Sequence, residues 1–270
     1  MDASMPADWL VPDWPAPPGV HALCTTRAGG VSAAPYDRMN LGAHVGDDVA
    51  AVQANRQVLQ AVLQTTTANA RAVFLNQVHG TDVAAIDLAT PDATSADACL
   101  STASGAVCTI MVADCLPVLF AHRGGSVVAA AHAGWRGLAG EAGEAGQGVL
   151  ESTVLRLAAQ GAVAAEVMAW LGPCIGPTAF EVGPEVRAAF CGHDPAAERC
   201  FVPQAGGKYL ADLAGLARLR LAALGITAVF GNDGTAPWCT VGNASRFFSH
   251  RRDTAALGGS GRFAACIWRG

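Results

Sequence analysis

Three short segments of the chain place metal-binding side chains among apolar residues. His79 lies in residues 76–80, Cys115 follows Asp114, and His132 ends an apolar run. Each segment is expected where a β-strand runs into a turn, so a rigid sheet would direct the three side chains into one pocket. Two imidazoles and one thiolate form a three-ligand set for a zinc-like ion and leave a fourth position for water or substrate. The sequence therefore predicts a catalytic metal centre with His79, Cys115 and His132 as ligands.

Other interpretations of these residues stay open. A lone histidine is usually a hydrogen-bonded surface or core residue, and the intervals between the three ligands match no compact zinc-finger spacing. Cys115 is alternatively a nucleophile activated by a nearby histidine, or an apolar core residue. Asp114 is costly to bury without a partner, so it is a candidate catalytic base near the metal or an anchor for a ligand histidine. Cys174, in a similar Gly-Pro setting, is the main rival of Cys115.

Three polar residues, Arg27, Asn40 and Gln77, lie close to glycines or to predicted strand ends. In a pocket they would bind an anion, a ribose hydroxyl or a nucleobase edge, and we predict them as substrate-binding residues. The alternative for each is stabilisation of its own loop. The Arg-Arg-Asp sequence at 251–253 is either a salt-bridged turn or a second anion contact.

The composition allows a large core and argues against nucleic-acid and membrane partners. Of the 270 residues, 51% are hydrophobic and 14% are charged, and the formal net charge is −5. The 17 basic residues are scattered, whereas nucleic-acid binding needs a clustered basic face. The most apolar stretch, residues 103–121, is interrupted by Asp114 and Pro117. Two buried strands explain that stretch better than a membrane span does.

The cysteines and the N-terminus point to a reducing compartment. The nine cysteines are an odd number without a Cys-x-x-Cys pair, and most lie in apolar segments. This usage favours reduced thiols that act as small core residues. The first residues show no basic region followed by an apolar run, so no secretory signal is expected. We therefore predict a cytoplasmic protein.

Strand and helix patterns predict one mixed α/β domain over residues 1–270. Apolar residues have helical spacing at 47–64, where Asp47 or Asp48 can cap the first turn. Further helices are expected from Gly137 to about residue 160, at 184–191 and at 209–224, and strands at 106–112, 117–121 and 127–132. Because strands and helices alternate without a strict β-α period, we expect a mixed α/β sandwich rather than a barrel.

Several strings of the chain together resemble one protein family. They are Thr25-Thr26-Arg27, Gly29-Gly30-Val31-Ser32, Asn40-Leu41-Gly42, Asn76-Gln77-Val78-His79-Gly80, Ala113-Asp114-Cys115-Leu116-Pro117, His132-Ala133-Gly134-Trp135-Arg136-Gly137, Leu171-Gly172-Pro173-Cys174-Ile175-Gly176-Pro177 and Phe247-Phe248-Ser249-His250-Arg251-Arg252-Asp253. The family they resemble is the laccase-domain or YfiH-type group of multifunctional purine nucleoside enzymes, also called peptidoglycan editing factors. The match covers nearly the whole chain, and strings of this length are highly specific.

The resemblance implies a cytoplasmic bacterial enzyme with a layered α/β/β/α fold and a zinc ion bound by His79, Cys115 and His132. The family is credited with phosphorolysis of adenosine, inosine, guanosine and methylthioadenosine, with deamination of adenosine, and with copper-dependent phenol oxidation. A member is also tied to the removal of mis-built muropeptide precursors. The implied partners are nucleosides and phosphate, and no protein partner is implied.

Among these activities, the residues favour nucleoside chemistry. A multicopper oxidase needs several copper centres with many histidines, often in His-x-His pairs, whereas this chain has seven histidines and no such pair. Phenol oxidation is then at most a side reaction of bound copper. The predicted function is a zinc-dependent purine nucleoside phosphorylase in which Arg27 holds the phosphate. Adenosine deamination would use the same pocket, with Asp114 as the proton carrier.

Two other classes of protein stay open. One is an amide hydrolase that acts on muropeptide precursors, with Cys115 as a nucleophilic thiol. The other is a non-catalytic metal-binding module, which predicts four protein ligands and makes Cys174 the natural fourth ligand. A count of the protein groups around the metal separates these classes.

Overall fold

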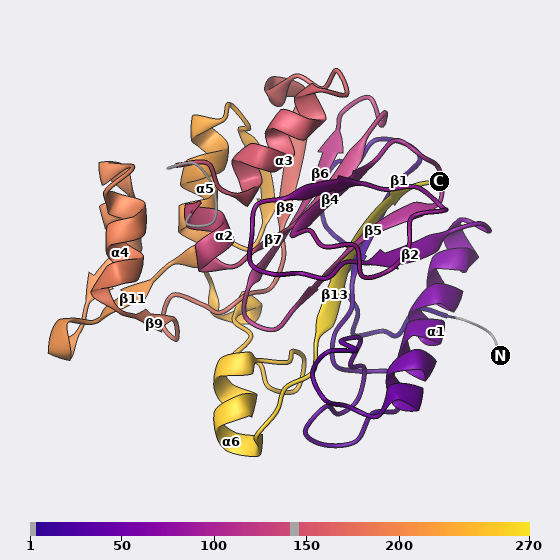
Figure 1. The fold of residues 1–270 in the computed structure, drawn as a ribbon, viewed down its shortest axis with the longest axis horizontal. Helices are drawn as coiled ribbons and strands as arrows, with labels where there is room; N and C mark the ends of the chain where they lie inside the picture. The colour runs from indigo at the N-terminus through magenta and orange to yellow at the C-terminus, as the bar shows by residue number, and fades with distance from the viewer. Residues whose placement is uncertain (1–3, 141–145) are drawn as a thin grey trace.

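The computed structural model describes residues 4–140 and 146–270 of the chain. Two β-sheets lie face to face at its centre, and helices cover the two outer sides (Figure 1). Helix α1 (Val49–Thr66) packs against one sheet, and α3 (Val149–Ala158) and α5 (Leu213–Ala223) lie on the side of the other. This arrangement confirms the predicted α/β/β/α layering.

The first sheet has four strands, and the last strand of the chain lies in its middle. In spatial order they are β1 (Val20–Cys24), β13 (Phe263–Arg269), β5 (Ala106–Val112) and β2 (Arg71–Phe74). Strand β13 pairs antiparallel with both β1 and β5, and β2 pairs parallel with β5. The two ends of the chain are thereby joined in one sheet.

The second sheet has six strands of mixed direction. In spatial order they are β12 (Ala228–Gly231), β8 (Val167–Leu171), β6 (Leu116–His122), β7 (Val128–Ala133), β4 (Ala98–Ser101) and β3 (Val83–Ala85). A smaller sheet of β10 (Phe201–Pro203), β11 (Tyr209–Ala211) and β9 (Glu181–Val182) lies with α4 (Pro184–Cys191) at one side of the molecule (Figure 1).

Strand β5 shows how its sequence forms the layers. Successive side chains of a strand point to opposite faces of the sheet. Ile110 accordingly packs in the core between the two sheets, where it meets Leu119 of β6. Val107 and Met111 face the other way and pack with residues of α1. A strand buried on both faces explains why all of its residues except Thr109 are apolar.

The helix predicted at 47–64 is confirmed as α1, and Asp48 caps it by accepting the Ala51 N–H at 2.8 Å. The helix predicted from Gly137 to about residue 160 is wrong as one element. Helix α2 (Trp135–Ala139) ends at Gly140, whose φ of +87° breaks the helical path, and α3 begins at Val149. Residues 141–145, which that prediction included, lie outside the described residues.

The helix predicted at 209–224 is also shorter than expected. Its first residues form strand β11, and α5 begins only after Asp212, which accepts the Gly215 N–H as an N-cap. Because strand β11 is separated from helix α5 by one residue only, the apolar pattern shows no break between them, and the prediction treated both as one helix.

The state of the cysteines and the character of the helices can be compared with the predictions of reduced thiols and of no membrane span. All nine cysteines are free thiols, and all except Cys115 and Cys191 are buried. Most of them thus act as small core residues, as predicted. In the described part of the chain, no helix combines the length and the apolar character that a membrane crossing requires.

Candidate metal centre and its pocket

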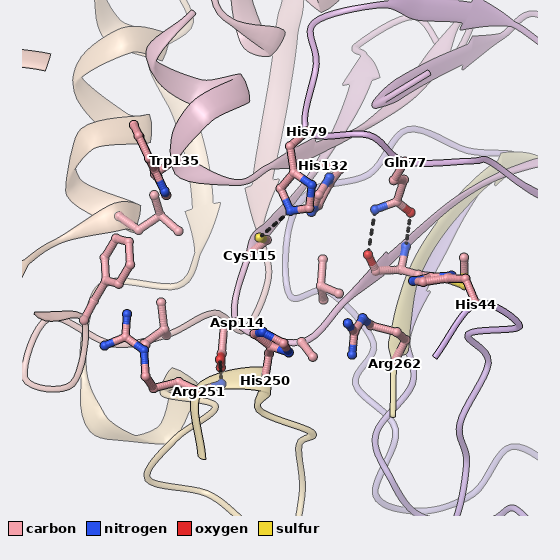
Figure 2. A pocket seen from close by; sticks show the side chains of 16 residues that line it. His44, Gln77, His79, Asp114, Cys115, His132, Trp135, His250, Arg251 and Arg262 are labelled. Atoms are coloured by element: carbon pink, nitrogen blue, oxygen red, sulfur yellow. Dashed lines mark hydrogen bonds between the residues drawn. The ribbon is translucent and has the colours of Figure 1, made fainter. Parts of the chain in front are cut away.

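The three predicted metal ligands meet at one end of the stacked sheets. His79 comes from the loop between β2 and β3, Cys115 from the turn between β5 and β6, and His132 from β7. Their ligand atoms all lie within 4.8 Å of one another, and Cys115 Sγ is 3.8 Å from His79 Nε2 (Figure 2). Tetrahedral zinc, with bonds of about 2.0–2.3 Å, needs ligand atoms roughly 3.3–3.6 Å apart. A small contraction of the cluster would reach that spacing.

The turn that carries Cys115 connects the two sheets, because β5 belongs to one and β6 to the other. Asp114 lies at the crossing with a φ of +91°, a conformation that non-glycine residues seldom adopt. Its carboxylate accepts hydrogen bonds from Thr240 Oγ1 at 2.5 Å, Ser249 Oγ at 3.1 Å and the Arg251 N–H at 2.7 Å. These contacts hold the turn and orient Cys115. The catalytic role of Asp114 stays a prediction.

Asp97 contacts two of the candidate ligands, and the sequence analysis missed it. It is fully buried just before β4, and its Oδ1 lies 2.8 Å from His132 Nδ1. The same carboxylate accepts the backbone N–H groups of Val78, His79 and Gly80. Asp97 therefore orients two of the three candidate ligands, the role that had been considered for Asp114. A charged residue between Ala96 and Ala98, within a buried segment, was the available signal.

The electrostatics of the cluster favour a charged pair. Burial alone would raise the pKa of the Cys115 thiol, but the positive charge of His132 and hydrogen bonds from both histidines lower that pKa to about 6. Burial would lower the pKa of His132, but the Cys115 thiolate and Asp97 raise it to about 9. Near neutral pH the cluster is thus a thiolate beside an imidazolium. The thiolate is the form that binds a metal or attacks an electrophile.

The residues of the cluster fit a zinc ion. A thiolate and two imidazoles suit zinc and also copper, and a carboxylate behind a ligand histidine is the usual partner in metal sites. Gly134 leaves the necessary space, because a Cβ atom there would lie 2.9 Å from His79 Cδ2 and 3.0 Å from Cys115 Sγ. Together with Asp97, this glycine shapes the site for three ligands.

The cluster opens into a cavity of about 330 Å³. Trp135 lies on one side of the cluster, and Gln77, His44 and Arg262 lie on the other (Figure 2). Further apolar lining comes from residues that follow β8 in the chain, namely Ile175, Phe180 and Leu213. The pocket therefore presents both apolar surface and cationic groups to a ligand near the cluster.

The three predicted substrate-binding residues have different positions. Gln77 lines the pocket, but its amide donates to and accepts from the Met111 backbone at 2.8 Å each, which joins the ends of β2 and β5. Asn40 is fully buried, and its Oδ1 accepts the Arg262 N–H at 2.8 Å. Arg27 lines a separate surface hollow, with an ion pair to Asp37 at 3.2 Å. The structure thus brings only the first of these three residues to the pocket.

The sequence left two roles open for residues 251–253, a salt-bridged turn and a second anion contact. Arg252 forms the salt bridge, and Arg251 faces the pocket. Arg252 forms an ion pair with Asp253 at 2.7 Å, as a salt-bridged turn requires. Arg251 lines the pocket and lies in a π-helical turn that also carries the pocket residue His250. Cys174, the rival of Cys115, is buried elsewhere and accepts a hydrogen bond from Asn232 Nδ2 at 3.3 Å.

The fold and the site define a class of layered α/β proteins with a three-ligand candidate metal centre at the junction of two sheets. Residues 21–270 match the family described as multi-copper polyphenol oxidoreductase laccase, and the chain belongs to this family. It is similar to a purine nucleoside phosphorylase of Pseudomonas aeruginosa, with 49% identity over 96% of this chain and 98% of that protein. It is 48% identical to the purine nucleoside phosphorylase YfiH of Escherichia coli, over 96% and 98% of the two chains.

Solved structures agree with this assignment. A crystal structure from Neisseria meningitidis superposes with a TM-score of 0.82 at 45% identity, covering 97% of this chain and 99% of that one. YlmD of Geobacillus stearothermophilus gives a TM-score of 0.83 at 28% identity, with 98% of each chain covered. The predicted family and fold class are therefore confirmed.

Proposed function

We propose that the chain is a zinc-dependent purine nucleoside phosphorylase that acts on adenosine, inosine, guanosine and methylthioadenosine. The observation that carries this proposal is the convergence of His79, Cys115 and His132 in a pocket with apolar and cationic lining. The names of the relatives from Pseudomonas aeruginosa and Escherichia coli point to the same reaction. A cytoplasmic location, where nucleosides and phosphate are available, belongs to the proposal and suits nine free thiols.

The pocket supplies separate surfaces for the two substrates. A purine base has apolar faces, and Trp135, Phe180 and Leu213 offer apolar contacts for it. Phosphate is an anion, and Arg262 and Arg251 offer positive charge. A cavity of about 330 Å³ falls in the usual range for small-molecule sites. In phosphorolysis a phosphate oxygen bonds to the ribose anomeric carbon, and the purine leaves with the electron pair of the glycosidic bond.

His79, Cys115 and His132 would hold the metal ion, and Asp97 would keep the His132 ring in its orientation. When bound, such an ion supplies Lewis acidity and a fixed point for orienting an oxygen ligand. Holding two substrates in the right orientation is itself a large part of catalysis in bimolecular reactions.

We propose adenosine deamination as a second reaction of the same pocket. It needs the same purine contacts, but here water bonds to C6 of the base, the C6–N bond breaks, and ammonia leaves to give inosine. Three protein ligands leave a coordination position open, which suits zinc-assisted hydrolysis. The two reactions then compete for one site, so inosine should inhibit adenosine deamination competitively.

Inosine and phosphate, supplied to zinc-loaded protein, should yield hypoxanthine and ribose 1-phosphate. Chelation of the metal should remove this activity, and zinc should restore it. Cys115→Ala should abolish it, whereas Cys191→Ser, which changes a thiol on α4 outside the pocket, should not. No release of hypoxanthine at any metal loading would defeat the proposal.

A specific observation supports an amide hydrolase as the competing function. The pKa of Cys115 is lowered to about 6 by the nearby histidine charge despite burial, as in thiol nucleophiles. Cys115→Ser separates the two functions, because loss of activity with full retention of zinc would favour a nucleophilic thiol.

Copper-dependent phenol oxidation, which the family description suggests, would be a side activity. The described residues contain one cluster of metal-ligand type, and a multicopper oxidase requires several.

A further inference from the structure

The cationic lining of the pocket includes an arginine without a carboxylate partner. Arg262 is partly buried just before β13, and the described residues place no carboxylate at salt-bridge distance from its guanidinium. The nearest negative groups are Cys115, which belongs to the metal-ligand cluster, and Asp114. Hydrogen bonds from Thr240, Ser249 and Arg251 already occupy the Asp114 carboxylate. A partly buried charge is stabilised by an opposite charge, so the guanidinium of Arg262 is suited to bind an anion that enters the pocket.

The side chain of Arg262 is held in a fixed position. Its Nη1 donates to the carbonyl oxygens of Ser260 at 2.9 Å and Gly261 at 3.0 Å. Gly42 packs so closely against the stem that a Cβ atom there would lie 2.8 Å from Arg262 Cγ. Asn40 Oδ1 accepts the Arg262 backbone N–H. The Nε and Nη2 groups, for which the described chain provides no acceptor, remain available to a ligand.

His44 and Arg262 lie near each other in the pocket wall and form what we call the anion corner. Figure 2 shows the Arg262 guanidinium directed into the pocket, toward His250 and the turn that carries Cys115. The His44 imidazole lies close enough to Arg262 for their charges to interact. A neutral imidazole can donate one N–H and thus complete the shell of an oxyanion held by a guanidinium fork.

We propose that the anion corner, Arg262 with His44, binds the phosphate co-substrate beside the His79–Cys115–His132 cluster. This inference rests on the proposed phosphorylase function. Arg262 donates to oxygens of phosphate that do not attack, so that another oxygen is free to bond to the ribose anomeric carbon as the purine leaves. Arg27, the phosphate ligand predicted from the sequence, already has Asp37 and the carbonyl oxygens of Asp37 and Ala244 as partners.

Titration calorimetry with orthophosphate, on zinc-loaded protein without nucleoside, tests the anion corner independently of turnover. Arg262→Met should raise the phosphate Kd about 10- to 100-fold, as expected when charge-assisted, forked hydrogen bonds are lost. Arg262→Lys keeps the charge without the fork and should give an intermediate Kd. The matched control is Arg27→Met, which should leave the Kd unchanged. Melting temperature and zinc content show whether each variant keeps its fold and its cluster.

Several results would overturn the anion corner: no phosphate binding by the wild type, an unchanged Kd in Arg262→Met, or a loss that appears in Arg27→Met instead. Acetate that binds in place of phosphate would assign Arg262 to a carboxylate substrate and would also overturn it. If phosphate binds through Arg262 but inosine is not cleaved, the phosphorylase proposal fails and the anion corner stands. If inosine is cleaved, Arg262→Met should raise the KM for phosphate and leave the KM for inosine unchanged.

Discussion

Replacement of Asp97 by asparagine tests whether this carboxylate holds the metal ligands in place. Asp97 is fully buried and accepts four N–H groups, one from the His132 ring and three from the backbone of residues 78–80. Asparagine has one oxygen where aspartate has two, so its NH₂ group must face two of those donors in either orientation. The substitution therefore loosens His79 and His132 together.

The size of the effect follows from these contacts. Each charge-assisted hydrogen bond to the buried carboxylate contributes about 1.5–3 kcal/mol, so the loss of two lowers the free energy of unfolding by up to about 3–6 kcal/mol before relaxation. Loss of a carboxylate that orients a metal-binding histidine weakens metal affinity about 10- to 100-fold. Competition with a zinc-binding dye, on folded protein near neutral pH, should show this increase in the zinc Kd of D97N.

Asp87→Asn is the matched control, because Asp87 is exposed and hydrogen-bonds within its own turn. Folded D97N that binds zinc as tightly as the wild type would refute the orienting role of Asp97. The pH dependence gives an independent check. Burial would raise the pKa of Asp97, but hydrogen bonding to His132 lowers it overall. The stability that Asp97 contributes should thus be present above about pH 4 and decline as the pH falls further.

Three further predictions concern the same pocket. Gly134→Ala should weaken zinc binding in a dye competition, because the added Cβ atom would displace His79 and Cys115. Gly242→Ala is the control and should not weaken zinc binding, because a Cβ atom at Gly242 would have no neighbour nearer than 3.8 Å. Equal zinc affinity in both variants would contradict the close packing at Gly134. In metal-free protein, alkylation of Cys115 by iodoacetamide should rise with pH around a midpoint of about 6, and His132→Asn should move that midpoint upward toward that of a free thiol. A midpoint that does not move would remove His132 as the cause. Zinc should also tighten phosphate binding, because a divalent ion leaves the cluster more positive even when it displaces one proton. Phosphate should then tighten zinc binding by the same factor. Calorimetry that finds the same phosphate Kd with and without zinc would contradict this.

Much of the fold and the metal cluster could be predicted because local signals coincide there. In Ala106–Val112 every residue except Thr109 is apolar, and a strand buried on both faces favours such a composition. His79, Cys115 and His132 each come where an expected strand meets a turn or ends. The geometric condition for a shared ion, proximity of the three ligand atoms, is met. That they bind a metal stays a prediction.

Asp97 escaped the sequence analysis because its role depends on a strand pairing. Strand β4 is only four residues long, Ala98–Ser101, and its sequence carries no strong alternation. Its antiparallel register with β7 pairs Ala98 with Ala131, which places Asp97 beside His132. Without β4 in the prediction, nothing connects these two residues across 35 positions of sequence.

The arginines Arg27 and Arg262 illustrate the same limit at longer range. Both arginines lie close to glycines, but the sequence analysis identified only Arg27 as a candidate phosphate ligand. Strand β13 lies between β1 and β5, so the residue just before it, Arg262, comes to the edge of the sheet where the Cys115 turn begins. Arg27 follows β1, one strand further from β5, and its guanidinium is held by Asp37 at the surface.

The metal-ligand cluster and the anion corner therefore depend on different parts of the architecture. The cluster depends on the register of β4 with β7, through which Asp97 reaches His132. The anion corner depends on the insertion of β13 and on the Asn40 loop that fixes the Arg262 backbone. Local sequence patterns reveal ligands that end strands, whereas they do not reveal which charged residue a distant strand brings beside them. A buried aspartate among apolar residues and an arginine just before the last strand are the local signals that these two sites leave in the sequence.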